Sequence, residues 1–443
     1  MATDTAAVQL ADELADIIRR THLKSGALVA SEQDLRASHD VGRSVLRQAA
    51  RILEERGVAF MKRGAGGGLI VAPPNPESAG RALAIVLESR MQGPHALDRL
   101  LMATDTHVFL TATPTLDLEE CERVRRLAIR LRRQSETGLP RVDEIRNLLT
   151  AIRRLVKDPL AGLAYQATAE YGQDLAPYSV LAGGHDFRNA WWDALLEMVE
   201  AQMAGDVAAL FGLRARQLAI VEESQDRWSA IDRDSRQMPV IEPVAAVEAQ
   251  SGQNPAERLA RELLRDVRLL DWAPGARIGG AGDLLARYGV TVGTLRQAVR
   301  MLEQNAVVRM ERGRSGGLVV TLPDPSRAIE RALAYLAQTD VALDDLVSFR
   351  RQLVLKAISA FCEAPDVDRV RALRGVQPGD LMDRLGTLCG DGALEVFLAI
   401  VSAIRSPSGP ADDTALRPVL VAMVEGDSAR ARRAFLNHEQ ARP

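Results

Sequence analysis

Arginine side chains recur in one short stretch of the sequence with a spacing suited to binding nucleic acid. Arg43 and Arg47 lie four residues apart, which places both on one face of a helix. A glycine-rich segment at 64–68 follows, and Lys62 and Arg63 precede it directly. Guanidinium groups hydrogen-bond to base edges and phosphates, and glycine lets the backbone approach a phosphate closely. These residues therefore offer binding to a polyanion, and no nucleophile paired with a base stands out in the sequence.

The elements around these residues can be predicted from hydrophobic periodicity and from capping residues. Apolar positions at 10, 14, 17 and 18 predict a first helix. Ser31 is the expected N-cap of a second helix, with Asp34 three residues later. A third helix is predicted from about residue 42 to residue 56, followed by two short strands at 58–63 and 69–71. Two helices joined by a tight turn and followed by a β-hairpin predict a winged helix-turn-helix.

The chain contains this pattern twice. Residues 10–71 align with residues 259–320 at a constant offset of 249, without a gap, and 26 of the 62 positions are identical. The identical positions include the run at 46–49, which matches 295–298, and the glycines of the hairpin. Each half of the chain is therefore one copy of the same module followed by a longer helical region.

The second copy lacks several of the polar residues of the first. Gly280 stands where Ser31 stood, Gly282 replaces Gln33, and Val292 occupies the position of Arg43. Of the pair Arg43 and Arg47, the second copy keeps only the equivalent of Arg47, which is Arg296. We expect the same fold with weaker or different sequence reading, or a module retained only as the partner of the first.

The charge distribution favours a site-specific nucleic-acid binder over a protein that coats nucleic acid. The formal net charge of the 443 residues is −3. Between residues 36 and 63, however, seven basic residues face three acidic ones, and between 285 and 314 six face two. Both predicted recognition segments are thus locally basic within an acidic chain.

Composition indicates a mainly helical, cytoplasmic protein. Hydrophobic residues make up 47% of the chain and aromatic residues only 4%, and most of the apolar content is Leu, Ala and Val. No signal peptide or membrane span is expected. Cys121, Cys362 and Cys389 are far apart without metal-ligand spacing, so we interpret them as free thiols.

The two modules resemble the GntR family of bacterial regulators. The matching residues are Ser31-Glu32 and Leu35, then Val41, Arg43, Val45, Arg47 and Ala49, and then Arg63-Gly64, Gly66-Gly67-Gly68 and Val71. The resemblance implies that Arg43 and Arg47 contact bases or phosphates and that the hairpin tip lies near the minor groove. The predicted DNA-binding residues are Ser31, Gln33, Arg36, Arg43, Ser44, Arg47, Lys62, Arg63, Gly64 and Gly66 in the first module, and Arg287, Thr291, Thr294, Arg296, Arg312 and Arg314 in the second.

The helical regions resemble the effector domain of the fatty-acid-responsive (FCD-type) branch of that family. Many such domains hold a metal through one Asp and three His. The equivalent positions carry Asp143, Asn147, Leu195 and Gln217 in the first region, and Asp383, Thr387, Leu416 and His438 in the second. Asn, Leu and Gln are poor ligands for a transition metal, so we predict no metal and no cofactor.

Other polar and aromatic residues of the helical regions carry weaker predictions. Asp143, Asn147 and His438 are candidates for lining an effector pocket. A solvent-facing pair is an equally good interpretation of Asp143 and Asn147, and an ordinary surface or core histidine is the better interpretation of His438. Trp191 and Trp192 are expected to be core residues because apolar residues surround them.

Together these observations predict a mainly α chain made of two winged helix-turn-helix domains, each with three helices and a small β wing, and each followed by an all-helical bundle. The predicted boundaries are 1–75 and 255–324 for the DNA-binding domains, 76–225 and 325–443 for the FCD-like domains, the second shortened, and 226–254 for a linker.

The sequence therefore predicts a cytoplasmic, sequence-specific transcription regulator, with repression favoured over activation. Its expected partners are a double-stranded DNA operator, read as an imperfect inverted repeat by an intramolecular pseudo-dimer, and a small organic acid as effector. Further homodimerisation is compatible with this interpretation, and no membrane partner is expected. Two alternatives stay open at this point: an interaction protein that has lost DNA binding and antagonises an intact relative, and an enzyme acting on a small acid.

Overall fold

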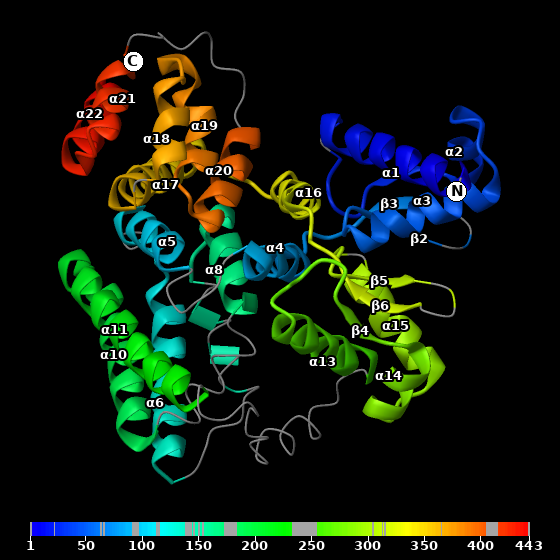
Figure 1. The fold of residues 1–443 in the computed structure, drawn as a ribbon, viewed down its shortest axis with the longest axis horizontal. Coiled ribbons are helices and arrows are strands. Elements are labelled where there is room, and N and C mark those ends of the chain that lie inside the picture. The colour runs from blue at the N-terminus through cyan, green and yellow to red at the C-terminus, as the bar shows by residue number, and fades with distance from the viewer. Residues whose placement is uncertain are drawn as a thin grey trace. The chain divides into compact units, whose positions relative to one another are not determined.

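A computed structural model of the chain provides the fold (Figure 1). The structure describes residues 2–441 apart from gaps at 22, 63, 65–66, 91–96, 112–115, 138–143, 145–146, 149–150, 153–154, 172–183, 233–254, 304, 312, 314–315, 365 and 405–414. The described residues form two compact units. The module unit comprises Met1–Ser89 with Gln253–Asp340, and the helical unit comprises Arg90–Gly252 with Val341–Pro443.

The first module has three helices and a three-stranded antiparallel sheet. Its elements are α1 (Ala2–Arg20), β1 (Leu28–Ala30), α2 (Glu32–Ser38), α3 (Arg43–Glu55), β2 (Ala59–Lys62) and β3 (Gly68–Val71). The strand order is β1-β3-β2, and the β2–β3 hairpin pairs Ala59 with Val71 and Lys62 with Gly68. This confirms the predicted winged helix-turn-helix, including both strands of the wing.

Local sequence explains where the elements of the first module begin and end. The Ser31 side chain accepts a hydrogen bond from the Asp34 amide at 3.1 Å and so caps α2, as predicted. Asp40, in the turn between α2 and α3, has a positive φ of 49°, a conformation that Asp tolerates better than most residues. After α3, Gly57 has a φ of 70° and allows the chain to turn into β2.

Strand β1 was not predicted from the sequence. Its pairing with β3 explains why position 68 is a glycine. β1 pairs with β3, and a Cβ on Gly68 would lie 2.3 Å from the carbonyl oxygen of Ala30. In the second module a Cβ on Gly317 would lie 2.6 Å from the carbonyl oxygen of Gly279. These glycines are therefore required by close strand packing, whereas the hairpin turn itself begins at Gly64 and Gly313.

The second module repeats this architecture. Its elements are α13 (Pro255–Leu269), β4 (Arg277–Gly279), α14 (Ala281–Tyr288), α15 (Val292–Glu303), β5 (Val308–Glu311) and β6 (Gly317–Val320), with strand order β4-β6-β5. Gly280 replaces the serine cap, but the Asp283 carboxylate still accepts a hydrogen bond from the Gly280 amide at 3.2 Å. The duplication visible in the sequence is thus a duplication of structure.

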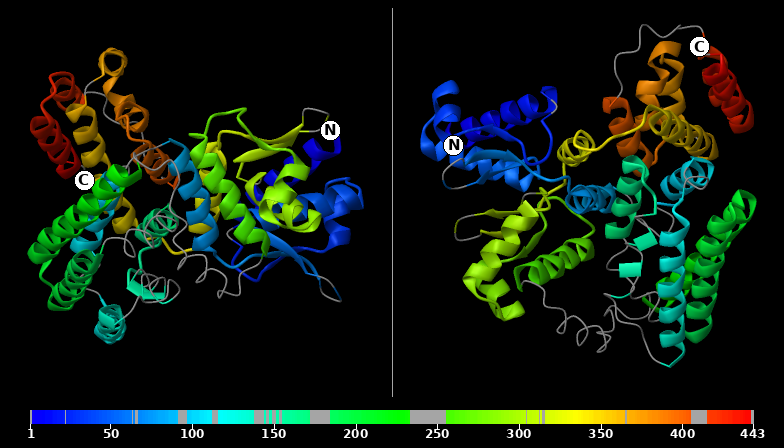
Figure 2. Two further views of the ribbon diagram at one scale, coloured as in Figure 1. Left: turned by 60° about the horizontal axis from the view of Figure 1, so that its bottom comes forward. Right: turned by 180° about the vertical axis from the view of Figure 1, so that it is seen from behind.

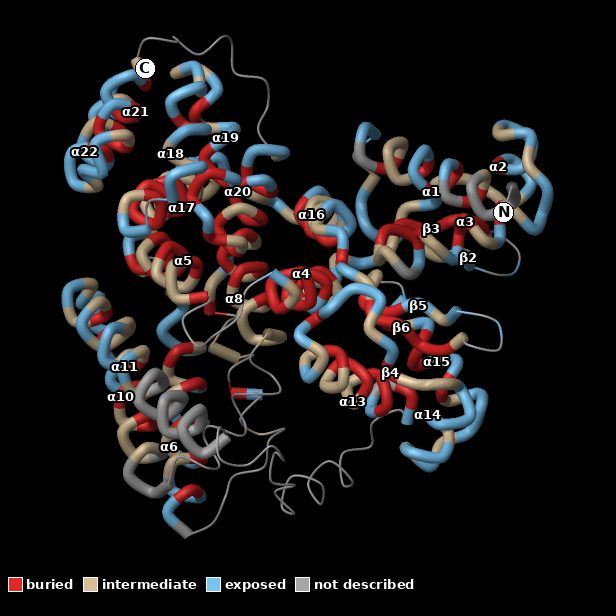
Figure 3. Tube along the Cα trace, in the orientation of Figure 1, coloured by how far each residue is buried: buried red, intermediate tan, exposed pale blue. Residues whose placement is uncertain are grey.

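The helices that follow the two modules each pack against the module of the other half of the chain. α4 (Pro76–Arg90) follows the first module, yet Ile85 belongs to the hydrophobic core of the second. α16 (Pro325–Leu336) follows the second module, and Ala334 packs against the core of the first. We call α4 and α16 the exit helices. α4 is buried along most of its length (Figure 3).

A paired-charge contact accompanies this exchange of exit helices. Glu88 of α4 is 9% exposed and accepts hydrogen bonds from Nε and Nη2 of Arg268 on α13 at 2.8–3.0 Å. Such a two-nitrogen contact fixes direction as well as distance. The two modules are therefore joined by an apolar contact and a buried ion pair as well as by the chain.

The helical unit contains two bodies, one from each half of the chain (Figures 1 and 2). The first body consists of α5 (Asp98–Thr111), α6 (Leu118–Thr137), α8 (Pro159–Tyr171), α10 (Gly184–Ala204) and α11 (Val207–Asp232). The second consists of α17 (Leu343–Glu363), α18 (Val367–Arg374), α19 (Leu381–Leu388), α20 (Gly392–Ile404), α21 (Arg417–Val424) and α22 (Ser428–Gln440). As predicted, Trp191 and Trp192 are core residues, 8% and 0% exposed.

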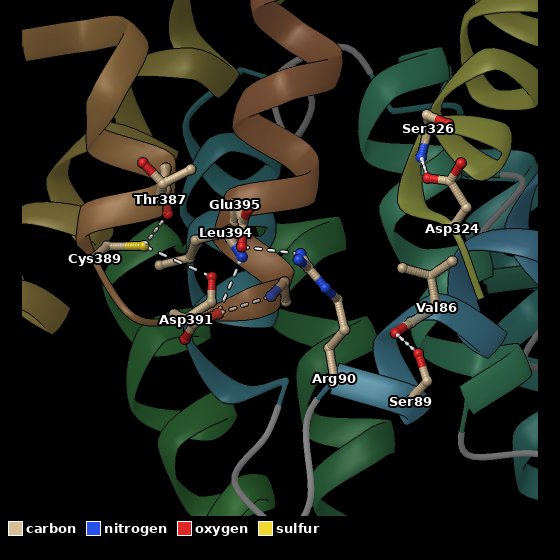
Figure 4. Close-up of polar contacts among 12 residues, drawn as sticks. Val86, Ser89, Arg90, Asp324, Ser326, Thr387, Cys389, Asp391, Leu394 and Glu395 are labelled. Carbon is tan, nitrogen blue, oxygen red and sulfur yellow. Dashed lines mark hydrogen bonds and ion pairs between the residues drawn. The ribbon is translucent and has the colours of Figure 1, made fainter. Parts of the chain in front are cut away.

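The two bodies contact each other through α5 and α17. His107 of α5 meets the ring of Phe349 of α17 edge-on, at 5.4 Å between ring centroids. At the end of α4, Arg90 donates to Glu395 at 2.9 Å, and the nearby Asp391 side chain caps α20 by accepting from the Leu394 amide (Figure 4). The helical unit is therefore held together by contacts between the two halves of the chain.

We predict that Arg268→Met loosens the module unit by leaving the buried Glu88 carboxylate without its main partner. The expected cost is about 2 kcal/mol, lower than for a fully buried pair because Arg268 retains some exposure. Native-state hydrogen exchange at the amides of α4 and α13 measures this cost directly.

The control is the double variant Glu88→Leu, Arg268→Met, which removes both charges and should recover most of the protection against exchange. Unchanged exchange in the single variant would show that the ion pair does not hold α4 in place.

Candidate nucleic-acid interface

Helix α3 has one buried and one exposed face. Leu46, Ala49 and Leu53 are fully buried in the core of the first module. On the other side Arg43, Ser44 and Arg47 are all exposed. The third helix of the module thus presents two arginines and a hydroxyl to solvent, the side chains that a helix entering a major groove requires.

Arg43, at the start of α3, is held by an acidic residue of the preceding helix. Its Nε donates to Glu32 at 2.9 Å, and the two side chains are 62% and 36% exposed. The pair contributes little stability because water screens it. Its effect is to orient the guanidinium while leaving the remaining nitrogens accessible. Sequence reasoning named Arg43 and missed this partner.

The residues at α2 that were predicted to bind DNA differ in whether their side chains are free to contact it. Gln33 and Arg36 are exposed. Ser31 is engaged in capping, and its hydroxyl also donates to the Asp34 carboxylate at 2.7 Å. Ser31 therefore stabilises the helix-turn-helix, and Gln33 and Arg36 are the better candidates for direct DNA contact.

The described part of the wing tip is open to solvent. Lys62 is exposed at the end of β2, and Gly64 follows with a φ of 103°. Arg63 and Gly66 of the first module, and Arg312 and Arg314 of the second, lie outside the described residues. Their predicted role in DNA contact stays a prediction.

The second module presents a different surface at the equivalent helix, α15. Val292, in the position of Arg43, is 57% exposed, and Ala281 stands where Glu32 stood. The arginine and its orienting carboxylate are thus both absent from this copy. Arg296 remains exposed, as Arg47 is in the first module.

The remaining predicted residues of the second module are engaged in local structure. Thr291 caps α15 by accepting from the Thr294 amide at 3.2 Å, and the two hydroxyls lie 2.9 Å apart. Arg287 donates to Asp266 of α13 at 2.8 Å and lies over the Tyr288 ring. Arg287 therefore connects two helices of its own module, and Arg296 is the best-placed residue for DNA contact in this copy.

Comparison with known families agrees with this geometry. The family model described as "Bacterial regulatory proteins, gntR family" matches residues 6–68 and 255–317. A solved structure, Streptococcus agalactiae GntR, is 18% identical with a TM-score of 0.30, covering 42% of this chain and 98% of that chain. No curated protein matches the chain.

The family match and the fold define the class of both modules. Each is a winged helix-turn-helix with an exposed, arginine-bearing third helix, which is a DNA-binding fold. The chain contains two DNA-binding domains of the gntR family of bacterial regulatory proteins, arranged in tandem. The resemblance of the helical bodies to the FCD-type branch stays a prediction, because the family match covers the modules alone.

The predicted effector-pocket residues are only partly visible. Asp143 lies outside the described residues, Asn147 is exposed, and His438 is half-buried on α22. Within the part of the chain that the structure describes, no group of three or more His, Cys, Asp or Glu side chains is arranged to hold a metal ion. None of the described helices combines the length and hydropathy needed to cross a bilayer.

The first body contains a buried polar cluster that the sequence did not reveal. Asp105 of α5 accepts from the Tyr165 hydroxyl at 2.5 Å and from Arg214 Nε at 2.7 Å, and Arg214 also donates to Gln217. Burial and the Asp105 charge raise the pKa of Tyr165 well above its usual value, so Tyr165 stays a donor. The members come from α5, α8 and α11, so no sequence spacing could have indicated them.

A second buried cluster joins the two bodies at His107. Its Nε2 lies 2.8 Å from Asp158 Oδ2, and its Nδ1 lies 3.0 Å from Ser348 Oγ on α17. The Asp158 side chain also caps α8 by accepting from the Leu160 and Ala161 amides. No spacing in the sequence indicates a role for His107, because its partners Asp158 and Ser348 are distant in the chain.

We predict that Arg214→Met strongly destabilises the first body, because Asp105 then remains buried with only Tyr165 as a neutral donor. The expected loss is about 3 kcal/mol of unfolding free energy. Urea unfolding followed by the fluorescence of Trp191 and Trp192, with Trp228 and Trp272 replaced by Phe, would report it.

The matched double variant Asp105→Asn, Arg214→Met should regain part of this stability. If the single variant unfolds at the wild-type urea concentration, the cluster contributes no net stability.

Proposed function

We propose that this protein is a sequence-specific transcription regulator that binds an imperfect inverted repeat in DNA as a single-chain pseudo-dimer. The observation that carries the proposal is the presence of two gntR-family DNA-binding domains within one compact unit. Regulators with this kind of domain commonly read two-fold symmetric sites as dimers. Two modules in one chain make binding to the second half-site intramolecular.

The exchange of contacts between the halves supports the pseudo-dimer. Ile85 and Ala334 each complete the core of the module from the other half, and Glu88 pairs with Arg268. In the helical unit α5 packs on α17. Contacts of this kind would hold two separate subunits together in an ordinary dimer. The predicted domain boundaries remain part of this proposal. They assign α4 to the first helical domain, 76–225, although Ile85 of α4 packs in the core of the second module.

The inverted repeat in the DNA is proposed to be imperfect because the third helices of the two modules differ. We call these helices, α3 and α15, the recognition helices. Arg43 offers a guanidinium suited to guanine, whereas the exposed Val292 offers methyl groups suited to the methyl of thymine. Arg47 and Arg296 are shared and supply the common part of the two half-sites. A half-site read by the second module thus differs from the other at the position that faces Arg43 in the first module and Val292 in the second.

Repression, relief of repression by a small organic acid, and further homodimerisation of the chain complete the proposal. They rest on the resemblance of the helical bodies to effector domains. Binding over a promoter blocks transcription without any further contact, which makes repression the simplest outcome of DNA binding alone.

One group of described residues resembles a catalytic site and so favours the alternative of an enzyme. The burial of its histidine argues against that interpretation. Ser348, His107 and Asp158 form the hydrogen-bonded series of a hydrolase. His107, however, is 0% exposed and Phe349 covers it, so a substrate cannot reach the imidazole. Asp158 is already used as a helix cap. We infer that the series is structural, joining the two bodies.

We predict that Arg47→Ala and Arg296→Ala each weaken one half-site of the operator. Footprinting of the full-length protein on its own promoter region should show two unequal protected half-sites, with protection of one of them abolished in each variant. An antagonist that has lost DNA binding predicts no footprint for the wild type, so this assay separates it from the regulator. Two identical half-sites unaffected by Arg296→Ala would show that only the first module reads DNA.

We predict that Val292→Arg makes the two half-sites more alike. Selection from a randomised operator should then enrich guanine at the position where the wild type selects thymine, with a preference of roughly 10- to 100-fold. Because Ala281 supplies no carboxylate to orient the new side chain, Ala281→Glu with Val292→Arg should strengthen the effect. Unchanged base preference in both variants would contradict the role of this position.

A further inference from the structure

The two recognition helices face a common cavity within the module unit. It has a volume of about 780 Å³ and is lined by Arg51 and Glu54 from α3 and by Gly293, Arg296, Gln297, Arg300 and Met301 from α15. Both modules contribute to it, so it does not exist in either module alone. We call it the inter-helix groove.

The lining of the groove is predominantly basic. Arg51, Arg296 and Arg300 contribute three guanidinium groups against the single carboxylate of Glu54. Arg300 and Arg296 are exposed, and within the described part of the chain neither forms an ion pair or a hydrogen bond through its side chain. An excess of guanidinium groups converging on one cavity favours an anionic ligand.

The repeat places two of these arginines at equivalent positions. Arg51 and Arg300 are equivalent at the constant offset of 249 between the two modules. Each lies one helical turn after an arginine that we predict to contact DNA, Arg47 in α3 and Arg296 in α15. Glu54 is exposed in the first module, whereas its equivalent, Glu303, accepts a hydrogen bond from the Met310 amide at 2.9 Å. The basic lining therefore comes from both modules, and the acidic group of the lining comes from the first.

We infer that the inter-helix groove is a phosphate-binding site that takes the DNA backbone running between the two half-sites. This inference rests on the proposed function and adds Arg51 and Arg300 as DNA-binding residues. Arg296 belongs to both surfaces, since it lines the groove and lies on the exposed face of α15. DNA that contacts Arg296 therefore lies beside the groove.

The chemistry of the lining suits a backbone better than a base. The guanidinium groups of Arg51 and Arg300 can each contact a different phosphate oxygen, and such contacts position the DNA without reading sequence. Gly293 adds no side chain, and a Cβ there would meet only the Thr291 hydroxyl at 3.7 Å, so the backbone of α15 is accessible. The groove thus supplies affinity and spacing, and Arg47, Arg296 and Val292 supply sequence preference.

The test measures how binding to the wild-type operator and to unrelated DNA depends on salt. Arg300→Gln and Arg51→Gln should each reduce the slope of log K against log salt by about 0.9 for each phosphate that the variant no longer neutralises. Both variants should weaken specific and non-specific binding by a similar factor. Glu54→Gln should have the opposite effect on affinity, because it removes the negative charge of the groove. The control is Arg371→Gln on α18, where the side chain is 80% exposed and beside Asp368, and the slope should not change.

The outcomes separate this inference from the proposed function. Loss of one protected half-site in Arg47→Ala, together with an unchanged salt slope in Arg300→Gln and Arg51→Gln, would overturn the groove and leave the regulator intact. No binding of the wild type to its promoter would overturn both. A second experiment measures thermal stabilisation of the protein by inorganic pyrophosphate at constant ionic strength. Thermal stabilisation by pyrophosphate that requires Arg300, with an unchanged DNA salt slope, would assign the groove to a small phosphate ligand and overturn the backbone site.

Discussion

A winged helix-turn-helix module is too small to bury a large core, and in this protein a residue from the exit helix of the other half packs on the core of each module. Ile85 of the first half lies in the core of the second module, whose other buried residues lie between Ala256 and Val320. Ala334 of the second half packs on the core of the first module, which contains Leu46 and Leu53. The buried pair of Glu88 with Arg268 adds direction to this apolar contact, because a carboxylate at 9% exposure requires a partner. The pairing of the modules, and with it the inter-helix groove, depends on this exchange.

The same principle of contact between halves is repeated in the helical unit with different chemistry. His107 is buried against Phe349 and connects Asp158 to Ser348, so the imidazole satisfies groups from both bodies at once. Buried polar groups in such a position must be paired and therefore specify one arrangement of the helices. Assembly of the two bodies thus accounts for the hydrogen-bonded series of hydroxyl, imidazole and carboxylate.

Duplication allows the two copies to diverge, and one place where they differ is the exposed start of the third helix, α3 in the first module and α15 in the second. Core positions such as Leu46 and Leu295 are unchanged because the same space must be filled in both modules. Arg43 and Glu32 are replaced together, by Val292 and Ala281, which removes a charge and its partner at the same time. A surface pair of this kind contributes little to stability, so its absence leaves the fold intact while changing what the helix can recognise.

The sequence by itself determined the modules, because each is built from local signals. The Ser31 cap, the buried face of α3 and the glycine after it are readable within one stretch of chain, and the offset of 249 shows that the pattern occurs twice. Strand β1 was missed because three residues carry no clear alternation. Only the tertiary structure decided the exchange of exit helices, the clusters at Asp105 and His107, and the groove between α3 and α15. These join residues that are distant in the chain, and their pairing depends on burial and charge compensation, which no spacing along a single sequence encodes.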